Sequence, residues 1–81
     1  MPYIRESVRH AIDVNGEEPR QIGDLNYKIT KLCKAWLYAQ GESYATYNSL
    51  IGVLECAKLE FYRRMVAPYE DQKIAENGDV Y

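Results

Sequence analysis

The stretch SYATYNSLIGVLECAKLEFYRRMV, residues 43–66, decides the fold of this chain. Ser43 is a good N-cap residue, so the stretch predicts a single helix that begins there and reaches about Val66. At 100° per residue its large apolar side chains gather in one arc, which Ile51 and Tyr62 extend. The members of this first stripe are Leu50, Leu54, Ala57, Phe61 and Met65.

A second, narrower stripe lies almost opposite the first and consists of Gly52, Cys56, Leu59 and Val66. An ordinary surface helix has one apolar face, whereas a helix that is apolar on two sides must be covered on two sides. Few residues remain in a chain of 81 to do so. We therefore expect a second copy of the chain to cover this stripe, and we predict these four residues as the oligomer interface. The alternative is that the N-terminal segment or the tail covers it.

A second main helix is predicted for residues 24–40. Asp24 suits the N-cap, and Gly41 suits the position just after the C-terminus. The apolar residues between them recur at helical spacing, which indicates an amphipathic helix. They are Leu25, Ile29, Leu32, Cys33 and Trp36.

Two shorter helices are predicted at the ends of the chain. The first covers about residues 4–12 and is followed by a loop, residues 13–23, with two Gly, one Pro and three acids. Pro68 is expected to end the helix of residues 43–66 and to suit the first turn of a fourth helix, residues 69–76, which stops at Gly78.

Together these elements predict one all-α domain over residues 1–81, with an N-terminal segment and loop at 1–23 and an acidic tail at 68–81. We expect a small helical hairpin or bundle, built on the helices of about 24–40 and 43–66. A chain of this length buries only about 60–65% of its unfolded surface, so its own core is marginal. We therefore expect homo-oligomerisation to complete the fold.

Disulfides and metals are not expected to supply the missing stability. Cys33 and Cys56 form no CxxC motif, and Arg5 and Glu6 stand where a secretory segment would be apolar, so we expect a reduced, cytoplasmic compartment and two small buried thiols. His10 is the only histidine, and no cluster of metal ligands accompanies it, so no metal site is predicted.

The sequence carries no motif for catalysis. It has no GxSxG, no phosphate-cradling Gly-rich loop and no HExxH, and His10 is the only conventional base. We therefore predict neither an enzyme nor a cofactor. With a net charge of −2, no double-stranded nucleic-acid partner is expected, and no apolar run approaches the ~18 residues of a membrane span.

Tyrosine is unusually frequent, with eight residues in the chain, and it suits an interface or a stacking platform for a flat ligand. Tyr27, Lys31, Lys34 and Tyr38 recur at helical spacing, nearly opposite the apolar stripe of the helix of residues 24–40. We predict that Lys31, Lys34 and Tyr38 bind a phosphate group with its base stacked on a ring. The alternative is a solvated face whose lysines lie around the tyrosine rings.

Arg63 and Arg64 are a second predicted anion-binding group, to which we add Tyr69. Both arginines can pair with Glu60 of their own helix, at spacings of three and four residues. If subunits bring their arginine pairs together, the guanidinium groups match phosphate oxygens. Alternatively, the acidic tail of a neighbouring copy neutralises them.

Three segments carry a resemblance to a known family: GDLNYKITKLC at 23–33, LIGVLECAKLEFYRR at 50–64 and VAPYEDQKIAENGDVY at 66–81. In these segments the chain resembles a family of short proteins of unknown function encoded by bacteria, phages and prophages. The match covers Gly23 to Tyr81, and residues 1–22 depart from it. The resemblance implies a bacterial or phage cytoplasm and assigns no role to any residue.

Two functions follow as hypotheses. Phages encode small oligomeric proteins that sequester the nucleotide second messengers of bacterial immunity, in pockets formed between subunits by Tyr, Lys and Arg, and this chain has that composition. We therefore expect a non-catalytic homo-oligomer that binds a small anion such as a cyclic nucleotide. The alternative is an adaptor or inhibitor that docks on a host protein.

Overall fold

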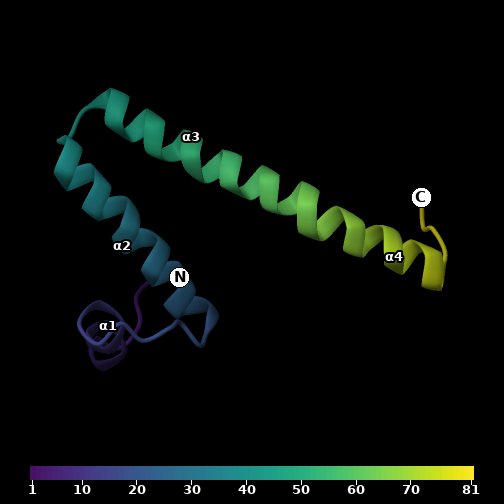
Figure 1. Cartoon of the computed structure of the whole chain (residues 1–81), viewed down its shortest axis with the longest axis horizontal. Helices are drawn as coiled ribbons and strands as arrows, with labels where there is room; N and C mark the ends of the chain where they lie inside the picture. The colour runs from purple at the N-terminus through teal and green to yellow at the C-terminus, as the bar shows by residue number, and fades with distance from the viewer. The chain divides into compact units, whose positions relative to one another are not determined.

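The computed structural model describes every residue from Met1 to Tyr81, and all of its regular structure is helical (Figure 1). The prediction of an all-α chain is therefore confirmed. Contacts within the chain define two compact units, residues 1–46 and 47–81, which are described separately. The elements are α1 (Glu6–Asp13), α2 (Ile22–Gln40), α3 (Tyr44–Phe61), the π-helical turn η1 (Tyr62–Val66) and α4 (Ala67–Asn77).

The first unit is organised by the packing of α1 on α2. Tyr27 on α2 is the only buried residue of the chain, with 8% of its surface exposed, and its hydroxyl donates a hydrogen bond to the Asp13 carboxylate at the end of α1. The apolar residues of α1, Val8, Ala11 and Ile12, are half-buried. The contact thus combines apolar packing with a satisfied phenol, as a buried Tyr requires.

The N-terminal segment crosses the start of α2 at Gly23. A Cβ atom on Gly23 would lie 3.1 Å from Ile4 Cγ2 and 3.1 Å from the Met1 carbonyl oxygen. The absence of a side chain at Gly23 therefore lets the backbone of residues 1–4 lie close against the first turn of α2.

The prediction that Asp24 is the N-cap of α2 is wrong by three residues, because the N-cap is Gln21. The helix begins at Ile22, and Asp24 lies in its first turn. Its Oδ2 atom accepts hydrogen bonds from the backbone N–H groups of Arg20 and Gln21, each at 3.3 Å. The carboxylate therefore reaches back over the helix start, as the third residue of a capping box does, and it also lies near the positive end of the helix dipole.

The turn between α2 and α3 follows the predicted signals. Gly41 has φ +91°, and its N–H donates to the Leu37 carbonyl at 2.8 Å, so it ends α2. Ser43 Oγ accepts the N–H of Thr46 at 3.1 Å, which is the N-cap bond of α3.

In the second unit the helix does not break at Pro68. The predicted helix of residues 43–66 keeps α geometry only to Phe61, and η1 then joins it to α4 with α-region backbone angles at both junctions (Figure 1). Pro68 has no N–H for the Arg64 carbonyl, and its ring would crowd that carbonyl in a regular helix. The wider turn, in which the Ala67 N–H bonds the Tyr62 carbonyl, accommodates the proline.

The π turn rotates every side chain after it about the helix axis, relative to a uniform α-helix. A single π turn inserts about one residue, so later residues fall roughly 100° behind their places on a uniform helix. Val66 was assigned to the second stripe on a uniform count, and the π turn displaces it from the line of Gly52, Cys56 and Leu59. The same shift moves Met65 from the edge of the first stripe, so within α3 this stripe ends at Phe61.

Large apolar side chains are exposed on both stripes of α3. Phe61 of the first stripe is 64% exposed and Leu59 of the second is 56% exposed. Cys56 was expected to be buried and is exposed, because no residue of the chain covers its side of α3, while Cys33 is half-buried. The apolar stripe of α2 is also largely uncovered, with Trp36 45% exposed.

The α1–α2 contact is tested by Tyr27→Phe, which removes the hydroxyl and keeps the ring. The hydrogen bond to Asp13 raises the pKa of Tyr27, so this bond stabilises the contact below pH 10 and is lost only as pH rises through that raised pKa. At neutral pH we expect amide hydrogen exchange in α1 to become several-fold faster in the variant. Tyr44→Phe, at an 83% exposed ring, is the matched control and should leave α1 unchanged. Equal exchange rates in both variants would contradict the role of the bond.

Candidate functional site

The basic face predicted on α2 is only partly a free surface. Tyr27, expected at its edge, is instead the residue that α1 covers. Further along the helix, the Lys34 ammonium group lies 5.8 Å from the centre of the Tyr38 ring, within cation–π range. Tyr38 is 73% exposed. Lys34 and Tyr38 therefore form an accessible pair of a cation and an aromatic face.

Lys31 lies at a different feature, an open hollow of about 330 Å³ between α1 and α2. Its lining combines cationic side chains with two carboxylates and the Tyr27 phenol, and it contains no Ser, Thr or Cys. Because charges of both signs meet there, the hollow suits a small dipolar group better than a phosphate. The lining residues are Glu6, Arg9, His10, Asp13, Val14, Tyr27 and Lys31.

Arg63 and Arg64 both bind the carboxylate of Glu60, as the spacing of three and four residues predicts. Arg63 Nη2 donates to Glu60 Oε2 at 2.9 Å and to Oε1 at 3.0 Å, and Arg64 Nε donates to Oε1. Hydrogen bonds from Arg63 and then Arg64 hold the pKa of Glu60 below its usual value. Two guanidinium groups thus share one carboxylate, which leaves one net positive charge for an external anion.

Tyr62 and Glu70 form a contact that the sequence pattern did not predict. The Tyr62 hydroxyl donates a hydrogen bond to the Glu70 carboxylate, and this bond raises the pKa of Tyr62. Eight residues on a uniform α-helix leave two side chains about 80° apart. The residue inserted by η1 makes this spacing equivalent to seven, which places both on one side two turns apart. The only sequence signal for this contact is Pro68, which acts on the helical turn that precedes it.

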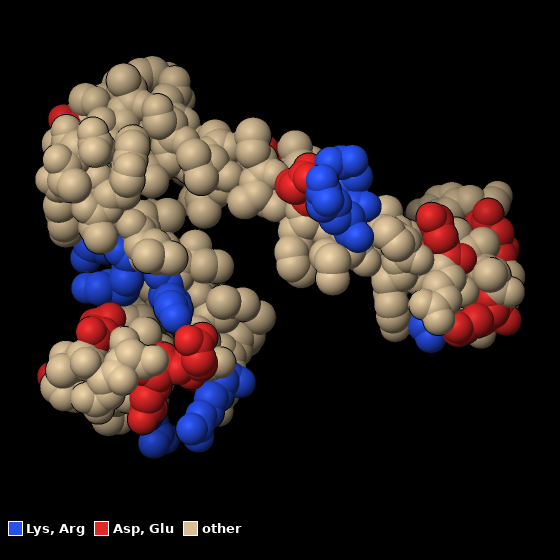
Figure 2. Space-filling view, viewed as in Figure 1, with Lys and Arg blue, Asp and Glu red and all other residues tan.

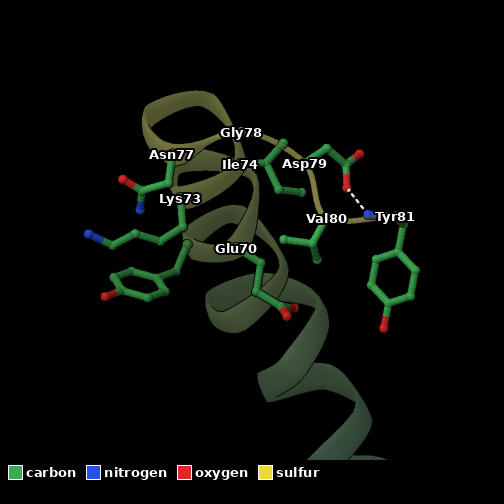
Figure 3. A pocket seen from close by; sticks show the side chains of 9 residues that line it. Glu70, Lys73, Ile74, Asn77, Gly78, Asp79, Val80 and Tyr81 are labelled. Carbon is green, nitrogen blue, oxygen red and sulfur yellow. Dashed lines mark hydrogen bonds between the residues drawn. The ribbon is translucent and has the colours of Figure 1, made fainter.

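Tyr69, the last predicted ligand-binding residue, lies beside Lys73, whose ammonium group is 5.5 Å from the ring centre. Both line a hollow of about 300 Å³ at the end of α4 (Figure 3). Gly78 ends α4 with φ +93°, after which Val80 lines the same hollow as Ile74 and Glu70 (Figure 3), and the Tyr81 N–H donates to Asp79 Oδ1 at 2.9 Å. Tyr69 therefore belongs to this hollow, whose lining includes neither Arg63 nor Arg64.

The six predicted ligand-binding residues thus fall into separate groups. Lys34 pairs with Tyr38 in the first unit, and Lys31 lines the α1–α2 hollow. In the second unit Arg63 and Arg64 surround Glu60, and Tyr69 accompanies Lys73 at the far end of α4.

The predicted interface residues of α3 are open to a neighbour. A Cβ atom on Gly52 would meet no atom within 4 Å, and both Cys56 and Leu59 are exposed. Figure 2 shows that charged side chains gather toward η1 and α4 and leave the N-terminal part of α3 uncharged. The interval from Ser43 to Leu54 has no charged residue.

No three His, Cys, Asp or Glu residues gather closely enough to hold a metal ion. Cys33 and Cys56 are free thiols. None of the helices combines the length and the apolar character that crossing a membrane requires.

A comparison with family models identifies a match over residues 1–80 to the family described as "Domain of unknown function (DUF6899)". The chain belongs to this family. The match includes residues 1–22, which the sequence resemblance had left out, so the α1 segment that covers Tyr27 is part of the DUF6899 domain. A search of curated proteins found no match, and a search of solved structures found none.

Proposed function

We propose that this DUF6899 protein is a non-catalytic, self-associating helical protein whose copies together bind a small anionic ligand such as a cyclic nucleotide. In this proposal the helices α2 and α3 form a hairpin that further copies complete into a bundle. Its setting is the cytoplasm of a bacterial cell, where a phage-encoded copy would sequester an immune signal. The observation that carries the proposal is the exposure of both apolar stripes of α3.

The amount of exposed apolar surface supports self-association. Eight large apolar side chains of α3 and η1 are between 39% and 66% exposed. At on the order of 100 Å² each, they present about 800 Å² per copy. A standard protein interface buries about 800 Å² on each partner, so the scale is right for covering by other copies. These residues are Tyr47, Ile51, Val53, Leu54, Leu59, Phe61, Tyr62 and Met65.

The cationic groups support an anionic, partly flat ligand. Arg63 and Arg64 offer planar guanidinium donors that match phosphate oxygens, and Glu60 neutralises only one of their two charges. Lys34 with Tyr38, and Lys73 with Tyr69, each combine a positive charge with an aromatic face. Phosphate and base together are what such combinations recognise in nucleotides.

The self-association step is tested by Leu59→Asp. Leu59 is 56% exposed in the single chain, so the change removes no internal core, but it would place an unpaired charge in the contact between copies. Burying such a charge costs on the order of several kcal/mol, so we expect the dissociation constant of the assembly to rise at least tenfold. Sedimentation equilibrium measures it, and Glu42→Lys, a charge change at an exposed residue before α3, is the control. An unchanged mass in Leu59→Asp would contradict the second stripe as the interface.

The ligand step is tested by thermal shift and calorimetry with a panel of cyclic di- and trinucleotides. We expect one of them to stabilise the wild-type protein, and Arg63→Gln with Arg64→Gln to weaken its binding about tenfold or more, because charge-assisted hydrogen bonds are lost. Glu60→Gln should have the opposite effect, because it removes the carboxylate that competes for both guanidinium groups.

The control for the ligand test is Lys28→Gln, whose ammonium group lies 3.7 Å from Glu18 and which belongs to none of the proposed groups. No stabilisation by any nucleotide, together with a stable complex with one bacterial protein, would replace the proposal with the adaptor or inhibitor alternative.

A further inference from the structure

The charges on the second unit are distributed unevenly along its axis. No charged residue lies between Ser43 and Leu54. The Arg63–Arg64–Glu60 group carries one net positive charge. The segment 68–81 holds four acids and one lysine, a net charge of −3, which Figure 2 shows as acidic side chains around α4. When two copies pair through α3, the acidic segments of the two copies lie either next to each other or at opposite ends of the pair. The same holds for their arginine groups.

The two apolar stripes of α3 share one midpoint. The first stripe runs from Leu50 to Phe61 within α3, and the second from Gly52 to Leu59. Both are centred between residues 55 and 56. A two-fold axis at this midpoint therefore overlays apolar residues on apolar residues, whichever stripe forms the contact.

We propose that two copies pair antiparallel through α3 about a two-fold axis between Glu55 and Cys56. This inference rests on the self-association in the proposed function and adds the orientation of the second copy. A parallel pair would bring the two −3 segments side by side, and it would also place the Arg63–Arg64 groups against each other, so like charges repel at two places. The antiparallel pair separates both and opposes the dipoles of the two long helices.

The orientation decides where an anion binds. In the antiparallel pair, residues 63 and 64 of one copy lie opposite residues 48 and 47 of the other. Each arginine pair then faces a neutral, tyrosine-containing part of the second copy, and Tyr47 and Asn48 are its nearest members. Two equivalent sites result, roughly 24 Å apart at 1.5 Å per residue, and each is made by both copies. A parallel pair would instead form one site on its axis.

Spin-label distances test the orientation. One label is placed by Glu55→Cys, beside the axis, and another by Gln72→Cys on α4, each alone in a Cys33→Ser, Cys56→Ser background. Paired helices lie about 8–10 Å apart. We expect double electron–electron resonance to give a distance below about 25 Å at position 55, and about 50 Å at position 72 from the helical rise.

Each other outcome overturns a distinct statement. Short distances at both positions mean a parallel pair, which contradicts the antiparallel orientation while self-association stands. A short distance at 72 with a long one at 55 means contact through α4, which also contradicts it. No dipolar coupling at either position, with a monomer mass of the wild-type protein in sedimentation, removes the proposed self-association itself. Circular dichroism of each labelled protein confirms that its helices are retained.

Discussion

A single helix cannot cover its own side chains, because residues on opposite sides of a helix never meet. The second unit consists of one continuous helical run, α3–η1–α4, followed by four residues that turn back along its end. Apolar residues lie on two sides of α3, and a large part of their surface is exposed. Helices in proteins derive most of their stability from packing an apolar face, so covering α3 is the requirement on which the stability of this unit depends.

In the first unit, by contrast, one face of a main helix is covered within the chain itself. The α1 segment covers Tyr27, and the bond from Tyr27 to Asp13 joins the end of α1 to the first half of α2. This contact uses the face of α2 that carries the lysines rather than its apolar stripe. The apolar stripe of α2 is thereby left available, as both stripes of α3 are, and the cations of the opposite face are divided between the α1–α2 hollow and the Lys34–Tyr38 pair.

The parts of the fold that the sequence predicted are those set by neighbouring residues. Gly41 and Gly78 end helices through a positive φ, Ser43 caps α3, and Arg63 and Arg64 pair with Glu60 one turn away. Each depends on a spacing of four residues or fewer. The Asp24 error has the same local character, because an acid can cap from within the first turn as well as before it.

The features that were missed depend on longer spacings. The Tyr27–Asp13 bond joins residues 14 apart across a loop, and the spacing of residues within one helix cannot predict such a pair. The Tyr62–Glu70 bond depends on the phase change at η1, which a uniform 100° count excludes. The same phase change separates Val66 from the second stripe. The ligand-binding groups are local pairs of residue types, so their composition could be predicted, whereas their assembly across copies lies outside what one chain determines.

The claim at the centre of this account is that other copies of the chain cover α3, so that folding and association are coupled. The most direct measurement is thermal unfolding, followed by circular dichroism, at protein concentrations that differ a hundredfold. Coupled association predicts that Tm rises by roughly 5–10 °C over this range, because mass action favours the folded assembly. A Tm that does not change with concentration would contradict the account, because it would mean that the chain folds without covering α3 by a second copy.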